Sequence, residues 1–154
     1  MSVLGIDLGG TKIAAGRVTD GAEIDGAMTL ASRAAEGFEI SIAQLWSAIE
    51  RTLDASVEAI GVAAPGPLDP IGGVILTPPH LKGWRNVPLA QMTQEKFGLP
   101  VRIENDCTAA ALGEARVGAG RGHSIVYYVA IGTGVGSGIV RNGEIYTGAH
   151  GCAG

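Results

Sequence analysis

The chain has 154 residues, of which 46% are hydrophobic and 17% charged, and its formal net charge is −4. This composition suffices for a buried core, excludes a disordered or coiled-coil chain, and leaves no basic surplus for binding a nucleic-acid backbone. No apolar run approaches the length that crosses a membrane. Glycine is unusually frequent, with 25 residues. It follows no collagen-like period, so each glycine is interpreted by its position.

The two cysteines, Cys107 and Cys152, lie far apart and have no metal-type spacing. We interpret them as reduced thiols of a cytoplasmic protein. Asp7 interrupts the first apolar stretch, and no basic region precedes it. No signal peptide is therefore expected.

The first half of the chain predicts short strands and one amphipathic helix. Residues 3–8 form an apolar run that ends at two glycines, and a turn at residues 20–21 indicates an opening meander. Apolar residues recur at helical spacing over residues 39–55, with Ser41 as a candidate cap. Strands are predicted over residues 3–8, 12–18, 22–25, 59–64 and 74–76.

The second half predicts two helices and a second set of strands. Pro88 suits the first turn of a helix, and Gly98 suits its end. A glycine-rich break at residues 118–122 is a candidate boundary, residues 132–138 form a glycine loop, and the Asn-Gly pair at 142–143 predicts a hairpin turn. Helices are predicted over residues 88–97 and 106–117, and strands over residues 100–103, 124–131, 139–141 and 144–146.

Two segments repeat one order of strand, glycine-threonine loop, strand and turn. The first comprises residues 5–12 with the turn at 20–21, and the second comprises residues 130–137 with the turn at 142–143. A repeat constrains the architecture. We therefore predict two related lobes, each of which opens with a hairpin whose tight turn carries glycines.

Glycine loops of this kind favour anion binding, because the backbone can approach a ligand closely and successive amides can converge on a phosphate. Hydroxyl groups and a lysine ammonium add further donors. The second loop is no dinucleotide fingerprint, because a strand follows it instead of a helix. The residues expected to bind nucleotide phosphates are Gly9, Gly10, Thr11 and Lys12 in the first loop, and Gly132, Thr133 and Gly134 in the second.

Several short motifs follow one another along the chain. They are Asp7-Leu8-Gly9-Gly10-Thr11-Lys12, Pro65-Gly66-Pro67-Leu68-Asp69, Gly83-Trp84, Glu104-Asn105-Asp106, Ala109-Ala110-Ala111-Leu112-Gly113-Glu114 and the glycine loop at 132–138. In this order they resemble the ROK family of sugar kinases and regulators, within the actin-like ATPase superfamily. The resemblance spans essentially the whole chain.

The resemblance implies an α/β fold, a ribonuclease H-like or actin-like ATPase lobe with a mixed sheet and flanking helices, plus the first hairpin of a second lobe. We expect the small lobe at residues 1–118 and the start of the large lobe at residues 119–154. Members of the family are roughly double this length, so the chain resembles their N-terminal half. Their cysteine-rich zinc motif comes later, and no structural zinc is expected here.

The resemblance also implies a role for each polar motif residue. Phosphoryl transfer to a sugar hydroxyl needs positioning, charge neutralisation and a base for the hydroxyl proton. Asp106 is the expected catalytic base, and Gly66, Asn105 and Asp106 are expected to bind the sugar. Asp7 is expected to hold Mg²⁺, since carboxylate oxygens suit this hard cation. The implied reaction is phosphorylation of a glucose-like hexose by ATP, with amino sugars, fructose and mannose left open.

Two other functions are weighed against the kinase. A ROK-type regulator would carry a DNA-binding helix-turn-helix before the first phosphate loop, for which the position of Asp7 leaves no room. The other is a non-catalytic sugar-binding or assembly module. We expect the chain alone to be inactive, because one side of the cleft is missing. We also expect it to form a homo-oligomer, or to bind the missing half, through apolar strands at 125–131 and 139–146. His80, in a proline-rich loop, is a further candidate for lining the sugar cleft.

Overall fold

A computed structural model describes residues 2–132, 134–149, 151 and 153. The chain forms two compact units, Met1–Asn105 and Asp106–Gly154. The lobe boundary at residue 118 stays a prediction, and Thr133 of the second phosphate loop lies outside the described residues. The elements are β1 (Ser2–Leu8), β2 (Lys12–Thr19), β3 (Ile24–Ala31), η1 (Ala34–Glu36), α1 (Phe38–Thr52), β4 (Val57–Ala64), β5 (Leu68–Asp69), β6 (Val74–Ile75), α2 (Leu89–Phe97), β7 (Val101–Asn105), α3 (Asp106–Arg116), β8 (Ile125–Ile131), β9 (Val135–Arg141) and β10 (Glu144–Ile145).

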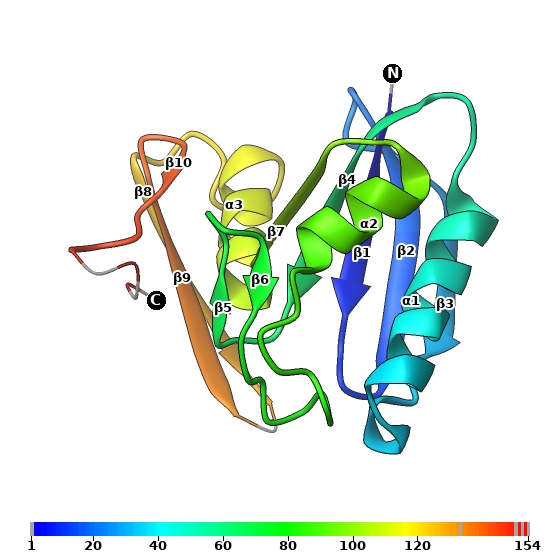
Figure 1. Cartoon of the computed structure of the whole chain (residues 1–154). Helices are drawn as coiled ribbons and strands as arrows, with labels where there is room; N and C mark the ends of the chain where they lie inside the picture. The colour runs from blue at the N-terminus through cyan, green and yellow to red at the C-terminus, as the bar shows by residue number, and fades with distance from the viewer. Residues whose placement is uncertain (1, 133, 150, 152, 154) are drawn as a thin grey trace. The chain divides into compact units, whose positions relative to one another are not determined.

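The first unit contains a five-stranded mixed sheet in the order β3-β2-β1-β4-β7 (Figure 1) and a separate two-stranded sheet of β5 and β6. Strands β1, β2 and β3 form an antiparallel meander, whereas β4 pairs parallel to β1 and β7 pairs parallel to β4. Helix α1 packs against β2 and β3, and α2 packs against β7. The mixed sheet with flanking helices confirms the predicted α/β class.

Alternation along β1 decides which face of this sheet forms the core. Leu4, Ile6 and Leu8 are at most 4% exposed. They belong to one apolar cluster with the buried stripe of α1, which includes Leu45 and Ile49. An amphipathic helix and an alternating strand bury their apolar sides together in this way. The intervening residues of β1 face away from α1.

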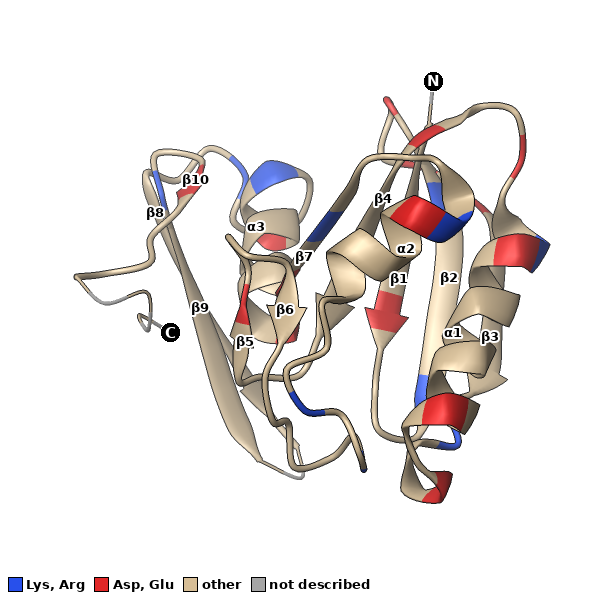
Figure 2. Ribbon diagram, in the orientation of Figure 1, with Lys and Arg blue, Asp and Glu red and all other residues tan. Residues whose placement is uncertain are grey.

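The second unit is a three-stranded antiparallel sheet in the order β10-β9-β8, against which α3 packs. The order repeats β3-β2-β1, so the predicted duplication of the opening hairpin is confirmed. Alternate residues of β8 are exposed: Ile125 by 64%, Tyr127 by 63%, Val129 by 45% and Ile131 by 85%. Figure 2 shows that the β8–β9 hairpin carries no charged residue over most of its length.

Three local predictions are wrong. Strand β3 extends to Ala31, because it pairs with β2 from Ile24 to its end. Strand β9 begins at Val135, so the second part of the predicted glycine loop is strand. Ser41 does not cap α1, because Gly37 holds the N-cap position and the Ser41 hydroxyl lies within the first turns.

Candidate functional site

Polar residues gather where the parallel strands of the first unit end. Asp7 is the penultimate residue of β1, and Asn105 is the last residue of β7. Gly66 follows the end of β4 by two residues. Because β1, β4 and β7 are parallel, their carboxyl ends share one edge of the sheet. Open α/β sheets bind ligands at this edge.

Gly66 and Asn105 lie close together at this edge. A Cβ atom added to Gly66 would lie 3.5 Å from Nδ2 of Asn105. The backbone amide of Asn105 donates a hydrogen bond to Oε1 of Glu104, 2.8 Å away. Two of the residues expected to bind sugar are therefore neighbours in the structure, and a carboxylate bonds the backbone of one of them.

The first phosphate loop is a tight turn between β1 and β2. The Gly9 amide donates to the Lys12 carbonyl oxygen at 2.9 Å, and Thr11 and Lys12 are exposed. A Cβ atom on Gly10 would lie 2.9 Å from the carbonyl oxygen of His80. Glycine is needed at position 10 because this backbone approaches so closely.

Loop 77–85 is thereby packed against the first phosphate loop, and Trp84 anchors it. The Trp84 side chain is 2% exposed, and its indole Nε1 donates to Oγ of Ser41 at 2.7 Å. Its ring meets Phe38 edge to face at 5.2 Å. Sequence reasoning assigned Trp84 no structural role, although the Gly83-Trp84 motif marks its position. The backbone of His80 lies beside Gly10, and its side chain is exposed. That the His80 imidazole contacts a sugar stays a prediction.

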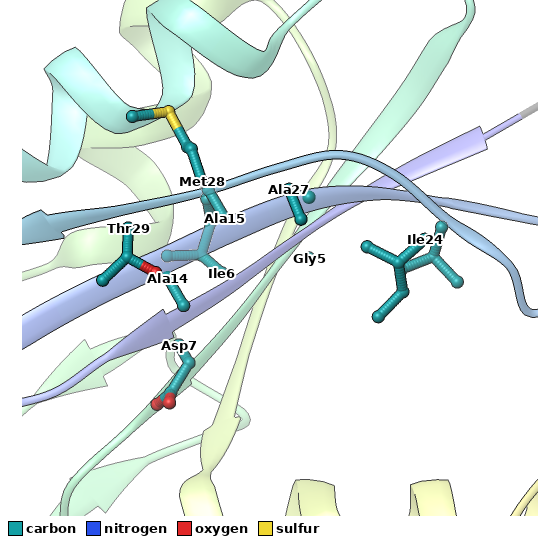
Figure 3. A pocket seen from close by; sticks show the side chains of 11 residues that line it. Gly5, Ile6, Asp7, Ala14, Ala15, Ile24, Ala27, Met28 and Thr29 are labelled. Carbon is teal, nitrogen blue, oxygen red and sulfur yellow. The ribbon is translucent and has the colours of Figure 1, made fainter.

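A hollow of about 510 Å³ opens on the face of the first sheet that lies opposite α1. Figure 3 shows Asp7, Ala14 and Thr29 together at one end of it and Ile24 at the other, with Gly5 and Ala27 between them. Its lining consists mainly of small apolar residues. Sugar and nucleotide sites need several convergent polar groups, so this hollow does not supply such a site by itself.

In the second unit, Asp106 is the first residue of α3. Its Oδ1 accepts a hydrogen bond from the Cys107 amide at 2.8 Å. An anionic side chain is stabilised at this end of a helix, where amide groups lack partners within the helix. Partial burial, together with the Asp106 carboxylate, raises the pKa of the Cys107 thiol.

The second phosphate loop joins β8 to β9, and its described residues are Gly132 and Gly134. The Gly132 amide donates to the Gly134 carbonyl oxygen at 2.9 Å. A Cβ atom at Gly132 or Gly134 would meet no heavy atom of the described residues within 4 Å. Space for a ligand is therefore present on these glycines, as an anion-binding turn requires.

The described residues contain no group of three or more His, Cys, Asp and Glu side chains that could hold a metal ion. Magnesium needs fewer, since it commonly takes one or two carboxylates and completes its shell with water and substrate phosphates. Asp7 is exposed at the end of β1 and suits such a role. Over the part of the chain that the structure describes, no helix is long and apolar enough to cross a membrane.

Comparison with known proteins gives one consistent family. A glucokinase from Thermotoga maritima is 34% identical over 98% of this chain, which corresponds to 48% of that protein. A putative xylose repressor from Caldicellulosiruptor is 36% identical over 99% of this chain and 39% of that protein. The crystal structure of a ROK family glucokinase from Streptomyces griseus, in complex with glucose and AMPPNP, superposes with a TM-score of 0.88 at 36% identity, covering 98% of this chain and 48% of that one.

The chain spans about half the length of the curated glucokinases that it matches. Residues 3–154 match the sequence profile described as the ROK family. The motifs, the mixed sheet and the duplicated hairpin agree with this match. The chain therefore belongs to the ROK family.

Proposed function

We propose that this chain carries the sugar-binding and phosphate-binding elements of an ATP-dependent hexose kinase with a glucose-like substrate. The observation that carries the proposal is the meeting of Gly66 and Asn105 at the carboxyl ends of β4 and β7, with Asp106 next in the chain. Support comes from the glucose and AMPPNP bound by the Streptomyces griseus relative and from the glucokinase of Thermotoga maritima.

Asp106 is the proposed catalytic base. A sugar hydroxyl is a weak nucleophile at neutral pH, and one positioned carboxylate suffices to accept its proton. At the start of α3 the carboxylate is held by the Cys107 amide. The side-chain amide of Asn105 both donates and accepts hydrogen bonds, so it can orient neighbouring sugar hydroxyls. Gly66 has no side chain, so its backbone can approach the sugar.

The two glycine loops are the proposed phosphate sites. In the first loop, Gly9, Gly10 and Thr11 would offer backbone amides and a hydroxyl, and Lys12 a positive charge. In the second loop, residues 132–134 would offer the turn that joins β8 to β9. Asp7 would hold Mg²⁺, and the bound ion supplies charge neutralisation to the phosphates. The chain's own residues bind and orient both substrates.

Calorimetric titration with glucose and with AMPPNP tests the proposal. We expect weak binding of both by the chain, and turnover in a protein extended to the length of its relatives. In that extended protein, Asp106→Asn should lower kcat by at least about 100-fold and leave glucose binding nearly intact. Glu58→Gln, an exposed carboxylate on β4, is the matched control. Loss of glucose binding together with turnover would make Asp106 a binding residue instead.

The 36% identity to a putative xylose repressor supports a second candidate, a sugar-sensing module of a ROK-type regulator. Such a protein would bind a sugar without transferring phosphate. Sugar binding in the extended protein without any release of ADP would favour this candidate over the kinase.

A further inference from the structure

The second glycine motif divides into two parts with different surroundings. On Gly132 and Gly134 a Cβ atom would meet no atom within 4 Å in the described part of the chain. On Gly136 it would lie 2.6 Å from Sγ of Cys107, and on Gly138 it would lie 2.6 Å from the Cys107 carbonyl oxygen. Such distances are far below van der Waals contact, so the second pair of glycines makes room for α3.

Gly136 and Gly138 lie within β9 and do not have a positive φ. Glycine is therefore needed there for space and not for backbone conformation. At Gly138 the backbone of α3 also approaches, because an added Cβ atom would lie 2.7 Å from Cα of Thr108. The first turn of α3 thus rests directly on the backbone of β9.

The carboxylate of Asp106 is linked to this contact through Cys107. It belongs to the residue before Cys107, and its Oδ1 accepts the Cys107 amide hydrogen. The packing that fixes the distance between Cys107 and β9 therefore also fixes the position of the Asp106 carboxylate. All these contacts lie within the second compact unit.

We propose that Gly136 and Gly138 are positioning residues for Asp106, and that they fix the carboxylate by letting the first turn of α3 approach β9. The inference rests on the proposed role of Asp106. The motif then has two roles, because residues 132–134 serve the phosphate, whereas Gly136 and Gly138 serve the base. Cys107 is the spacer between the strand and the helix.

Thiol reactivity tests the contact in the chain as it exists. In a Cys152→Ser background, the rate at which iodoacetamide alkylates Cys107 is measured against pH. Gly136→Ala displaces the thiol from its partly buried position beside Asp106. The pKa of the thiol, read as the midpoint of the plot of rate against pH, should therefore fall. It should also fall in Asp106→Asn. Each unit of fall in this pKa raises the thiolate fraction at pH 8 by up to about tenfold, and the alkylation rate rises less because a thiolate of lower pKa is a weaker nucleophile. Gly134→Ala should leave the profile unchanged. An unchanged profile in Gly136→Ala, or an equal shift in Gly134→Ala, would overturn the assignment.

A second-site variant separates positioning from stability. In the protein extended to the length of its relatives, and well below its unfolding temperature, Gly136→Ala should lower kcat by about tenfold and leave glucose binding nearly intact, because the base is displaced and the sugar contacts are kept. Adding Cys107→Ala should restore kcat, because it removes the Sγ atom and the Cβ atom of residue 107 lies 3.6 Å from the added methyl group. The same addition should not restore Gly138→Ala, whose methyl group meets backbone.

The outcomes separate the two proposals. Wild-type kcat in folded, extended Gly136→Ala would reduce these glycines to a structural role and refute positioning. If the wild-type chain binds no glucose, the proposed function fails. The thiol profile then still decides whether the second pair of glycines holds the first turn of α3.

Discussion

Replacing Trp84 tests how loop 77–85 is held beside the first phosphate loop. Trp84→Phe keeps an aromatic ring against Phe38 but removes the indole donor to Ser41 and leaves unfilled volume. The hydrogen bond contributes about 1 kcal/mol and the lost volume about 1 kcal/mol more, so unfolding should become easier by about 2 kcal/mol. Ser41→Ala should cost about 2 kcal/mol, because it leaves a buried N–H group without its acceptor.

The double variant decides whether this hydrogen bond carries the effect. With the donor already removed, Ser41→Ala should cost about 1 kcal/mol less than it does alone. Urea unfolding followed by far-ultraviolet circular dichroism measures all four proteins at one pH. Trp46→Phe is the control, because the Trp46 indole N–H has no hydrogen-bond partner in the described part of the chain. The loss of unfolding free energy caused by Trp46→Phe should be additive with the loss caused by Ser41→Ala. If the losses of unfolding free energy in Trp84→Phe and Ser41→Ala add to within about 0.3 kcal/mol in the double variant, the hydrogen bond between the two residues does not carry the effect.

Three further predictions concern activity, association and pH. The chain by itself should show no sugar-dependent release of ADP in a coupled assay, because it spans 48% of its glucokinase relative and catalysis by positioning needs both sides of the cleft; robust turnover would contradict this. The chain should self-associate through the bare face of β8, where burying ~600 Å² of apolar surface favours association by on the order of 15 kcal/mol before entropy and ordering offset much of it. Light scattering at micromolar concentration should detect oligomers that Ile131→Lys weakens, and a folded wild-type monomer would count against it. The hydrogen bond from Arg17 lowers the pKa of Asp25 in the folded protein. The ionised Asp25 therefore stabilises the fold fully above its unfolded pKa of about 4, and this stabilisation is lost as the pH falls through the lower folded pKa. Melting temperatures between pH 2 and pH 5 should therefore fall less steeply in Asp25→Asn than in the wild type, and identical slopes would exclude the ion pair as the cause.

Local sequence signals determined most of the elements and the order of the motifs. Gly98 ends α2 in the left-handed conformation, and the Asn-Gly pair at 142–143 turns the last hairpin with positive φ at both residues. These conformations depend on the residues themselves, because glycine and asparagine tolerate positive φ. The start of α3 at Asp106 was predictable for a similar reason, since an aspartate suits a helix N-terminus.

Tertiary contacts decided what these signals left open. Strand β3 is mostly exposed and its first four residues show no alternation, yet its pairing with β2 extends it from Ile24 to Ala31. Ser41 has the chemistry of a cap, but the buried indole of Trp84 makes it an acceptor inside the helix. A run of alternating glycines is read locally as one loop, whereas pairing with β8 places Gly136 and Gly138 in a strand and the packing of α3 requires glycine there. Strand pairing, buried hydrogen bonds and close backbone approach join residues far apart in the chain, so no local pattern encodes them.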